Sequence, residues 1–362
     1  MKKNKLSVII SLLILSVIIL TNTTPTQLAL AASTDATEVA ADVAVSGRFW
    51  ELFFGKREDS KSCSKVLIPS GAVFGARIVQ SFPSVVESNT PSVKAGDIIL
   101  EVDGCKMQTV EEIKEHIAVS KNASVRLLLA RGQSKISCTV TPTLEDGEYR
   151  LGIALKDTSA GIGTITYIDP ETGCFGGLGH GITDRDSGLL VDTAGGEVTG
   201  VILGGIQKGE QGKPGELTGM LTDKVYGQIY ANTSVGIFGK LDQVPEGCIE
   251  VEMGKKEDVH TGSAEIISTV RNGKTSKYKV EIYDVKRDES GTKCFKIKVT
   301  DPTLLAITGG IVKGMSGSPI IQNGKLIGAV THVMIADPTE GYGIFIENML
   351  SASGAEVPQK VA

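Results

Sequence analysis

Short apolar stretches separated by glycine-rich turns follow one another over residues 149–350. No part of this region has the spacing of a long amphipathic helix, and the segment 208–216 is polar enough for a surface loop. Many short strands at close spacing are typical of a barrel or a sandwich. We therefore predict a mainly β domain over residues 143–352, with strands at 161–167, 198–203, 235–238, 279–282, 294–299, 320–321 and 326–330.

The preceding residues 65–142 predict a smaller module of strands and one helix. The helix begins at Thr109, because Thr109 and Glu112 form a capping box and Ile113 and Ile117 share one helical face. Apolar runs predict strands of this module at 66–68, 76–79, 124–130 and 136–140, and a further apolar strand inside 94–104 that enters and leaves through glycine turns.

The order of these elements and the sequence KAGDIILEVDG at 94–104 resemble a PDZ domain. Domains of that fold bind an extended peptide as an added strand beside a groove, and a glycine-containing loop holds the carboxylate or backbone of the peptide. The resemblance implies a loop near residues 71–75 and a groove formed by Gly75, Ala76, Arg77 and Ile78. A peptide ligand of this module is therefore an expected partner.

The N-terminus has the pattern of an export signal. Three lysines precede an apolar run at 6–20, and the sequence ALA at 29–31 suits signal-peptidase cleavage. The run is shorter than the roughly 20 residues of a relaxed transmembrane helix. Residues 1–31 are interpreted as either a signal peptide or a membrane anchor, and both place the rest of the chain outside the cytoplasm.

Two further segments complete the predicted organisation. Residues 32–64 are expected to form a linker that carries an apolar island at 49–54, and residues 353–362 are expected to form a C-terminal tail. The island favours either an interfacial membrane contact or packing against a neighbouring domain.

Composition narrows the possible functions. The net charge is -5 and no basic run lies beyond the extreme N-terminus, so nucleic acid is not an expected ligand. The 43 glycines and the small aromatic fraction of 5% suit a turn-rich β protein, and 362 residues fit two folded units. The six cysteines are scattered and form no CxxC or Cys/His cluster. We therefore expect no metal and no other cofactor, and mostly reduced cysteines.

A glycine-flanked serine is the main chemical candidate. The sequence GMSGSP at 314–319 lies between an expected strand end at 311–312 and an expected hairpin with the turn NG at 323–324. Gly314 and Gly317 allow unusual dihedrals and a close approach to substrate, so Ser316 suits attack on a carbonyl group. The N–H groups of Gly314 and Ser316 are the expected oxyanion hole. A plain glycine–serine hairpin is the alternative.

A serine nucleophile needs a base, and the chain has four histidines. His116 on the expected helix and His260 in a charged turn are expected at the surface. His180 has small neighbours that leave the imidazole accessible, so it is the predicted base. His332 follows the serine by one hairpin and is expected to form a wall of the substrate cleft, and it is the alternative base.

A carboxylate should orient the histidine, and Asp301 is the predicted acid because it lies between His180 and Ser316 in the chain. Asp184 and Asp186 remain rivals. The resulting order of His, Asp and Ser is that of the chymotrypsin-type double β-barrel.

The sequence TDPTLLAITGGIVKGMSGSPIIQNGK at 300–325 resembles the stage IV sporulation protein B family of serine peptidases. The same family pattern fits the segments 149–153, 161–164, 179–180, 331–333, 337–339 and 341–344. The resemblance covers nearly the whole chain, as an N-terminal hydrophobic segment, a PDZ domain and a trypsin-like peptidase domain. It implies that the catalytic His, Asp and Ser of the family are His180, Asp301 and Ser316.

The resemblance also implies a role in sporulation signalling. Members of this family are released into the space between forespore and mother cell, cut themselves, and then cut a membrane-bound regulator, which activates a late sporulation sigma factor. The expected partners are therefore a protein substrate at a membrane surface and the chain's own linker at 32–64. The alternatives are a PDZ-led scaffold with an idle peptidase domain, a structural envelope protein, or a peptidase paralogue that serves another sporulation step.

Overall fold

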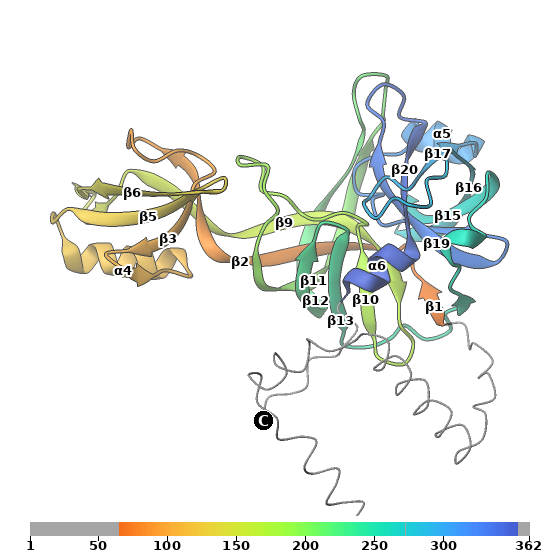
Figure 1. The fold of residues 1–362 in the computed structure, drawn as a ribbon, viewed down its shortest axis with the longest axis horizontal. Helices are drawn as coiled ribbons and strands as arrows, with labels where there is room; N and C mark the ends of the chain where they lie inside the picture. Colours follow the sequence, from red (N-terminus) through yellow and green to blue (C-terminus); the bar gives the residue numbers. More distant parts are fainter. Residues whose placement is uncertain (1–64, 272, 354–362) are drawn as a thin grey trace, which may run out of the picture. The chain divides into compact units, whose positions relative to one another are not determined.

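The computed structural model describes residues 65–271 and 273–353, which form a mainly β structure (Figure 1). The segments predicted as export signal or anchor, linker and apolar island lie outside these residues, as does nearly all of the predicted tail. Within the described residues, no helix is long and apolar enough to cross a membrane.

Six strands close into a first barrel. Neighbouring strands pair in the order β9-β10-β13-β12-β11-β2, and β2 pairs back onto β9, which closes the ring. Apolar side chains alternate into its interior, where Phe74, Ile78 and Phe175 are at most 2% exposed. The strands are β2 (Val73–Ser88), β9 (Ile153–Ile168), β10 (Cys174–Gly177), β11 (Thr193–Gln207), β12 (Glu216–Thr233) and β13 (Gly236–Leu241).

A second barrel follows in the chain and closes in the order β15-β16-β17-β20-β19-β18. Its core includes the fully buried side chains of Phe295 and Phe345, whose ring centroids lie 5.4 Å apart. The strands are β15 (Gly262–Arg271), β16 (Lys274–Tyr283), β17 (Phe295–Val299), β18 (Pro319–Gln322), β19 (Lys325–Val333) and β20 (Glu340–Phe345). Two closed rings confirm the predicted double β-barrel.

Short elements surround the second barrel. Helix α5 (Pro302–Thr308) leads from β17 towards β18, and α6 (Ile346–Ala352) follows β20. The short strands β1 (Val66–Pro69) and β14 (Val251–Glu252) pair with each other, and β1 also pairs with β9. A one-turn helix, η1 (Lys256–Asp258), precedes β15.

The PDZ module has its own helix and core, and its strands β3, β5 and β6 continue the sheet of the first barrel from β2. Helix α4 (Val110–Ser120) has Thr109 as its N-cap, with the predicted capping box to Glu112, and buries Ile113 and Ile117. These features confirm the predicted helix. The remaining elements are β3 (Ile98–Val102), β4 (Cys105–Lys106), β5 (Val125–Arg131), β6 (Ser134–Val140), β7 (Thr143–Glu145) and β8 (Glu148–Arg150).

The structure divides the chain differently from the predicted boundary at residue 65. The PDZ module is an insertion into the first barrel, because β2 and β9 each run through both units. Residues 73–79 of β2 pair with 158–164 of β9 inside the barrel, whereas residues 84–88 pair with 153–156 inside the module. The register shifts between Val79 and Ser84 mark the transition. Local apolar patterns predicted only the parts of these strands at 76–79 and 161–167, and they do not encode which sheet a strand joins.

The predicted peptide groove at Gly75, Ala76, Arg77 and Ile78 is therefore corrected. These residues pair with β11 on one side and with β9 on the other, so neither strand edge is free for an added peptide. Ala76 and Ile78 are 1% and 0% exposed in the core of the first barrel. Strand addition needs an unpaired edge, which this segment lacks.

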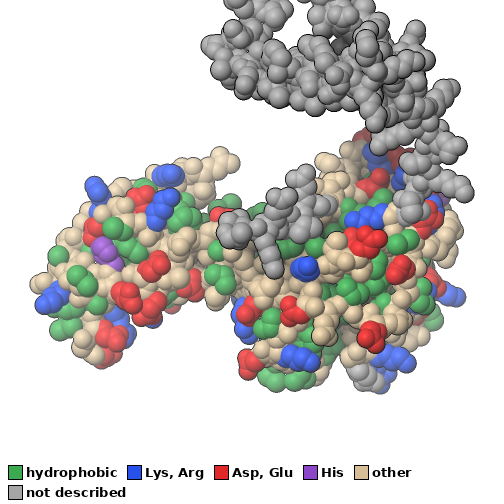
Figure 2. Space-filling view, turned by 90° about the horizontal axis from the view of Figure 1, so that it is seen from below, with side chains coloured by type: hydrophobic (Ala, Val, Ile, Leu, Met, Phe, Trp, Pro, Cys, Tyr) green, Lys and Arg blue, Asp and Glu red, His purple; other side chains and the backbone are tan. Residues whose placement is uncertain are grey.

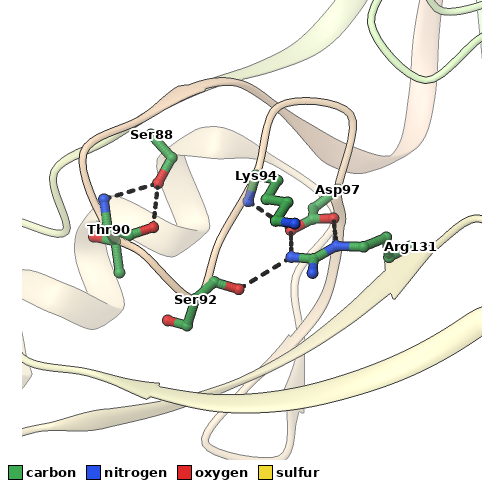
Figure 3. A network of polar contacts seen from close by, with 6 residues as sticks. All are labelled: Ser88, Thr90, Ser92, Lys94, Asp97 and Arg131. Carbon is green, nitrogen blue, oxygen red and sulfur yellow. Dashed lines mark hydrogen bonds and ion pairs between the residues drawn. The ribbon is translucent and has the colours of Figure 1, made fainter.

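A polar network fixes the loop that leads into β3 (Figure 3). Arg131 holds Asp97 through two hydrogen bonds of 2.6 Å and also donates to the carbonyl of Ser92. Burial alone would raise the pKa of Asp97, but hydrogen bonds from Arg131 and from the N–H of Lys94 lower it below its usual value. The same loop lies close to the segment between β10 and β11, because a Cβ atom on Gly96 would lie 3.0 Å from the backbone nitrogen of Ser187.

Lysine and arginine side chains are interspersed with aspartate and glutamate side chains over the described face in Figure 2. An extended single-sign basic patch is the usual electrostatic footprint of nucleic-acid binding. The visible distribution instead resembles an ordinary mixed protein surface.

Candidate active site

Ser316 lies on a tight turn that precedes β18. The N–H of Met315 donates to the carbonyl of Val312 at 3.1 Å, and the N–H of Ser318 donates to the carbonyl of Met315 at 2.9 Å. Gly314 and Gly317 have φ values of 95° and 96°, a region that favours glycine. A Cβ atom on Gly317 would also collide with the carbonyl oxygen of Thr164. The two glycines are thus required by backbone geometry.

The two serines of the turn have different environments. The Oγ of Ser316 donates to the carbonyl of Thr331 at 2.7 Å, and its side chain remains partly exposed. Ser318 is 0% exposed, and its hydroxyl bonds to the carbonyl of Met315 and to the hydroxyl of Ser268. Only Ser316 can meet a substrate, so Ser318 has a structural role.

The predicted oxyanion donors are unpaired in this structure. No hydrogen bond within residues 65–271 and 273–353 uses the N–H of Gly314 or of Ser316. Backbone N–H groups that lack a protein partner beside a nucleophile are suited to an oxyanion. The assignment of these two groups as the oxyanion hole stays a prediction.

His180 follows β10 after a sharp change of chain direction. Leu178 and Gly179 both have positive φ values, of 67° and 66°. The Nδ1 of His180 lies 2.9 Å from the carbonyl oxygen of Gly181. Because a carbonyl only accepts, Nδ1 carries the proton and Nε2 is left as the base. Burial lowers the pKa of His180, and the bond to Gly181 opposes this effect.

The segment after His180 is held by side chains that sequence reasoning did not identify. Asn232 accepts from the N–H of Ile182 at 2.8 Å and donates to the carbonyls of Ile182 and Val191. The Nζ of Lys156 on β9 lies 2.7 Å from the Oδ2 of Asp184 and 3.5 Å from the Oδ2 of Asp186. The two rival carboxylates thus pair with a lysine, and no polar residue pattern in the sequence indicates these long-range partners.

The ring of His332 packs against the ring of His180. The ring centroids are 4.9 Å apart and the rings are tilted by 36°. Burial, followed by the nearby His180 and Lys293, lowers the pKa of His332 to about 4. Its Nδ1 is buried without a hydrogen-bond partner among the described residues. His332 is therefore neutral near pH 7.

Among the described residues, no hydrogen bond or ion pair joins Asp301 to His180. Asp301 is the N-cap of α5, where its Oδ1 accepts from the N–H groups of Thr303 and Leu304 at 2.9 and 3.1 Å. Its Oδ2 accepts from the N–H of Lys279. Burial would raise the pKa of Asp301, but these backbone donors lower it. None of the hydrogen bonds of the described residues joins a carboxylate to His180.

The role of Asp301 as the N-cap of α5 could have been predicted from the sequence. An aspartate directly before a proline and an apolar run is a typical start of a helix, because aspartate favours the N-cap and proline the first helical position. Our prediction placed Asp301 at the end of a strand and did not include helix α5.

Three comparisons relate the chain to known proteins. Residues 147–350 match the family model described as SpoIVB peptidase S55. A putative zinc metalloprotease, CPE1693 of Clostridium perfringens, is 29% identical over 94 residues, which are 25% of this chain. The chain spans only 28% of the length of that curated relative.

Two solved structures resemble parts of the chain. The PDZ domain of the SdrC-like protein Lmo2051 from Listeria monocytogenes is 24% identical, with 22% of this chain and 87% of that domain covered at a TM-score of 0.19. The active form of the Rv3671c protease from M. tuberculosis is 17% identical, with 56% of this chain and 77% of that chain covered at a TM-score of 0.32. The family match carries the assignment, because it covers more than half of the chain: this protein is a serine peptidase of the SpoIVB peptidase S55 family.

Proposed function

We propose that the chain is an endopeptidase in which Ser316 is the nucleophile and His180 is the general base. One observation carries the assignment: the Ser316 hydroxyl bonds to the carbonyl of Thr331, and the ring of the next residue, His332, packs on His180. The nucleophile turn, the end of β19 and the His180 loop therefore meet at one place.

The proposed reaction is acyl transfer. The Oγ of Ser316 leaves the carbonyl of Thr331, passes its proton to Nε2 of His180, and bonds to the peptide carbonyl carbon. The N–H groups of Gly314 and Ser316 stabilise the negative oxygen of the tetrahedral intermediate. The C–N bond then breaks, and the leaving nitrogen takes the proton from His180. A water molecule hydrolyses the acyl-enzyme in the same way and restores Ser316.

The carbonyl of Gly181 takes the tautomer-fixing role in this proposal. Catalysis requires Nε2 to be free, and a hydrogen bond from Nδ1 ensures this whether the acceptor is a carboxylate or a carbonyl. A neutral carbonyl stabilises the imidazolium less than a carboxylate would. The tightly capped Asp301 supports this arrangement over the predicted triad.

A fluorophosphonate probe tests the nucleophile. We expect mass spectrometry to find the adduct on Ser316, and Ser316→Ala to lose both labelling and proteolysis. Ser318→Ala is the matched control, because its buried hydroxyl is structural and labelling should persist. Folded wild-type protein that takes no label, or takes it on Ser318, would contradict the proposal.

We further propose the sporulation role that membership of the family suggests. The chain would be exported, would act between forespore and mother cell, and would cut a membrane-associated regulator to trigger late sigma-factor activation. Deletion of the gene, complemented by wild type or by Ser316→Ala, tests this role through a late sigma-factor reporter. Rescue by Ser316→Ala would favour the scaffold alternative, and an unaffected reporter would favour a paralogue that serves another step.

Self-processing belongs to the same proposal. Exposed linkers are preferred sites of proteolysis, and a tethered linker meets the active site at high effective concentration. We expect a cut between residues 33 and 64, seen by N-terminal sequencing. If wild type and Ser316→Ala begin at the same residue, the cut belongs to another protease.

The proposed peptide ligand of the PDZ module needs a different groove from the predicted one. Residues 153–156 of β9 pair with β2 along one edge, and no strand of the described residues pairs with the other. Helix α4 lies beside this segment, since the N–H of Val110 donates to the carboxylate of Asp157 at 2.9 Å. Gly152, with a φ of 68°, forms the turn before the strand. We propose that an extended peptide adds at this edge.

Hydrogen exchange tests the groove with a synthetic peptide of residues 33–64. Added peptide should protect residues 152–157 and α4 in Ser316→Ala protein, which cannot consume the peptide. A peptide with its sequence scrambled is the control. Protection at Gly75 to Ile78 instead would return the ligand to the predicted segment.

A further inference from the structure

Thr164 on β9 contacts both halves of the candidate active site. Its hydroxyl donates to the carbonyl of Gly314 at 2.8 Å, and its N–H donates to the carbonyl of Ser316 at 3.1 Å. Its own carbonyl accepts from the N–H of Leu178, two residues before His180, at 3.1 Å. Thr164 is 0% exposed. One buried residue of the first barrel thus joins the nucleophile turn to the histidine segment.

The orientation of the N–H groups in the Ser316 turn depends on the hydrogen bonds that its carbonyl groups accept. The free N–H groups of Gly314 and Ser316 share peptide planes with the carbonyls of Lys313 and Met315. The carbonyl of Lys313 accepts from the N–H of Leu217, and that of Met315 from the N–H of Ser318, both at 2.9 Å. Thr164 holds the peptide group that follows each of these two planes, through the carbonyls of Gly314 and Ser316. Rotation of either of these following groups would disturb the adjacent N–H group and turn it away from a substrate carbonyl.

We propose that Thr164 is a positioning residue that keeps the oxyanion hole assembled, an inference that rests on the proposed peptidase function. The side-chain hydroxyl of Thr164 supplies the hydrogen bond to the carbonyl of Gly314. The backbone N–H of Thr164 does not supply this bond, because it donates to the carbonyl of Ser316. Preorganised donors act without rearranging during the reaction, so their orientation affects turnover more than substrate binding. The acyl-transfer step therefore depends on Thr164 although Thr164 touches no reacting atom.

Thr164→Val keeps the side-chain shape and removes the hydroxyl. We expect kcat on a peptide substrate to fall about 10- to 100-fold with KM nearly unchanged, since loss of a direct oxyanion donor costs about 10²–10³-fold. Affinity for a peptide boronate, which forms a tetrahedral adduct at the nucleophile, should fall in parallel with kcat/KM. Thr164→Ser keeps the hydroxyl and should restore kcat to within a few-fold of wild type.

Thr166→Val is the matched control. Thr166 is also 0% exposed on β9, and its hydroxyl donates to the carbonyl of Gly317 at 2.7 Å, beyond the two oxyanion donors. We expect a similar loss of thermal stability in Thr166→Val but a smaller loss of kcat. Equal losses of kcat in the two variants would show a general packing effect and would overturn the proposal.

Other outcomes are equally decisive. Folded Thr164→Val with wild-type kcat overturns the positioning role while leaving the peptidase function intact. If Thr164→Val does not fold, Thr164→Cys, a weak donor of similar size, takes its place: reduced kcat with normal KM supports the role, and wild-type kcat overturns it. A wild-type protein that takes no fluorophosphonate label refutes the proposed function itself, which separates the two failures.

Discussion

The imidazole rings of His180 and His332 pack against each other with their centroids 4.9 Å apart. Two imidazoles at this separation strongly disfavour a state in which both are charged. The pKa of His332, at about 4 because of burial and then of the nearby His180 and Lys293, keeps it neutral where His180 titrates. In the proposed reaction, the proton taken from Ser316 is therefore held by His180 alone.

The pH dependence of kcat/KM should follow the deprotonation of His180. A general base must be neutral, so activity should rise as the pH rises through the pKa of His180 and be lost below it. Burial lowers that pKa below the ordinary value of 6.5. We expect the midpoint of the acid limb, measured with a fluorogenic peptide, to lie below pH 6.5. A midpoint above this value would show that a carboxylate or another charge stabilises the imidazolium.

His332 should make the folded protein sensitive to acid. Its pKa is about 4 in the folded protein against an ordinary 6.5, so the unfolded chain binds more protons between these values. Stability should therefore fall as the pH falls from about 6.5 to about 4. His332→Phe keeps an aromatic ring beside His180 and removes this titration. Urea unfolding across this pH range should show a smaller loss in the variant, and equal losses would contradict the assignment.

Asp301→Asn separates a helix cap from a catalytic acid. Asparagine caps helices about as well as aspartate, whereas alanine costs about 1 kcal/mol. From the contacts of Asp301, we expect Asp301→Asn to keep stability and turnover near wild type and Asp301→Ala to lower the melting temperature. A fall of about 10⁴-fold in kcat for Asp301→Asn, the size found for this change in the chymotrypsin triad, would restore Asp301 as the acid. It would also mean that the active form breaks the α5 cap.

Lys156→Met should loosen the segment after His180. Asp184 is 8% exposed, and loss of its partner leaves a nearly buried carboxylate without its cation, at a cost of roughly 1–3 kcal/mol. We expect lower thermal stability and a several-fold lower kcat. Asp184→Asn together with Lys156→Met should recover part of the stability, because the unpaired charge is gone. A double variant no more stable than Lys156→Met alone would argue against the ion pair as the source of the effect.

Local patterns were sufficient for the nucleophile turn and for α4. The glycines around Ser316 are needed for positive φ values at the turn itself, and the capping box of Thr109 and Glu112 involves residues three apart. Such features depend on neighbours in the chain, so the sequence shows them directly. For the same reason the sequence predicted β13, β17, β18 and β19 and parts of β9, β11 and β16, whereas β10, β12, β15 and β20 were not predicted.

The long-range pairing of strands could not be predicted from such local patterns. Ala76 and Ile78 form an ordinary apolar strand, and only their partners in β9 and β11 show that the strand belongs to a barrel. Thr164 was part of a predicted strand, but its hydroxyl bonds to the carbonyl of Gly314, which lies 150 residues further along the chain. At Asp301 the local signal of the α5 cap was passed over in favour of chain order, and its role as the catalytic acid stays a prediction.

The insertion of the PDZ module between β2 and β9 also constrains how the protein is made. The first barrel cannot close until both strands are present, and the module lies between them in the chain. Early folding of the module would bring the two strand segments together and remove most of the loop-closure entropy from barrel formation. A nascent chain that stalls or misfolds within the module therefore has no closed barrel to hold Thr164 against the Ser316 turn. Proteolytic competence should therefore appear only after the whole insertion has folded.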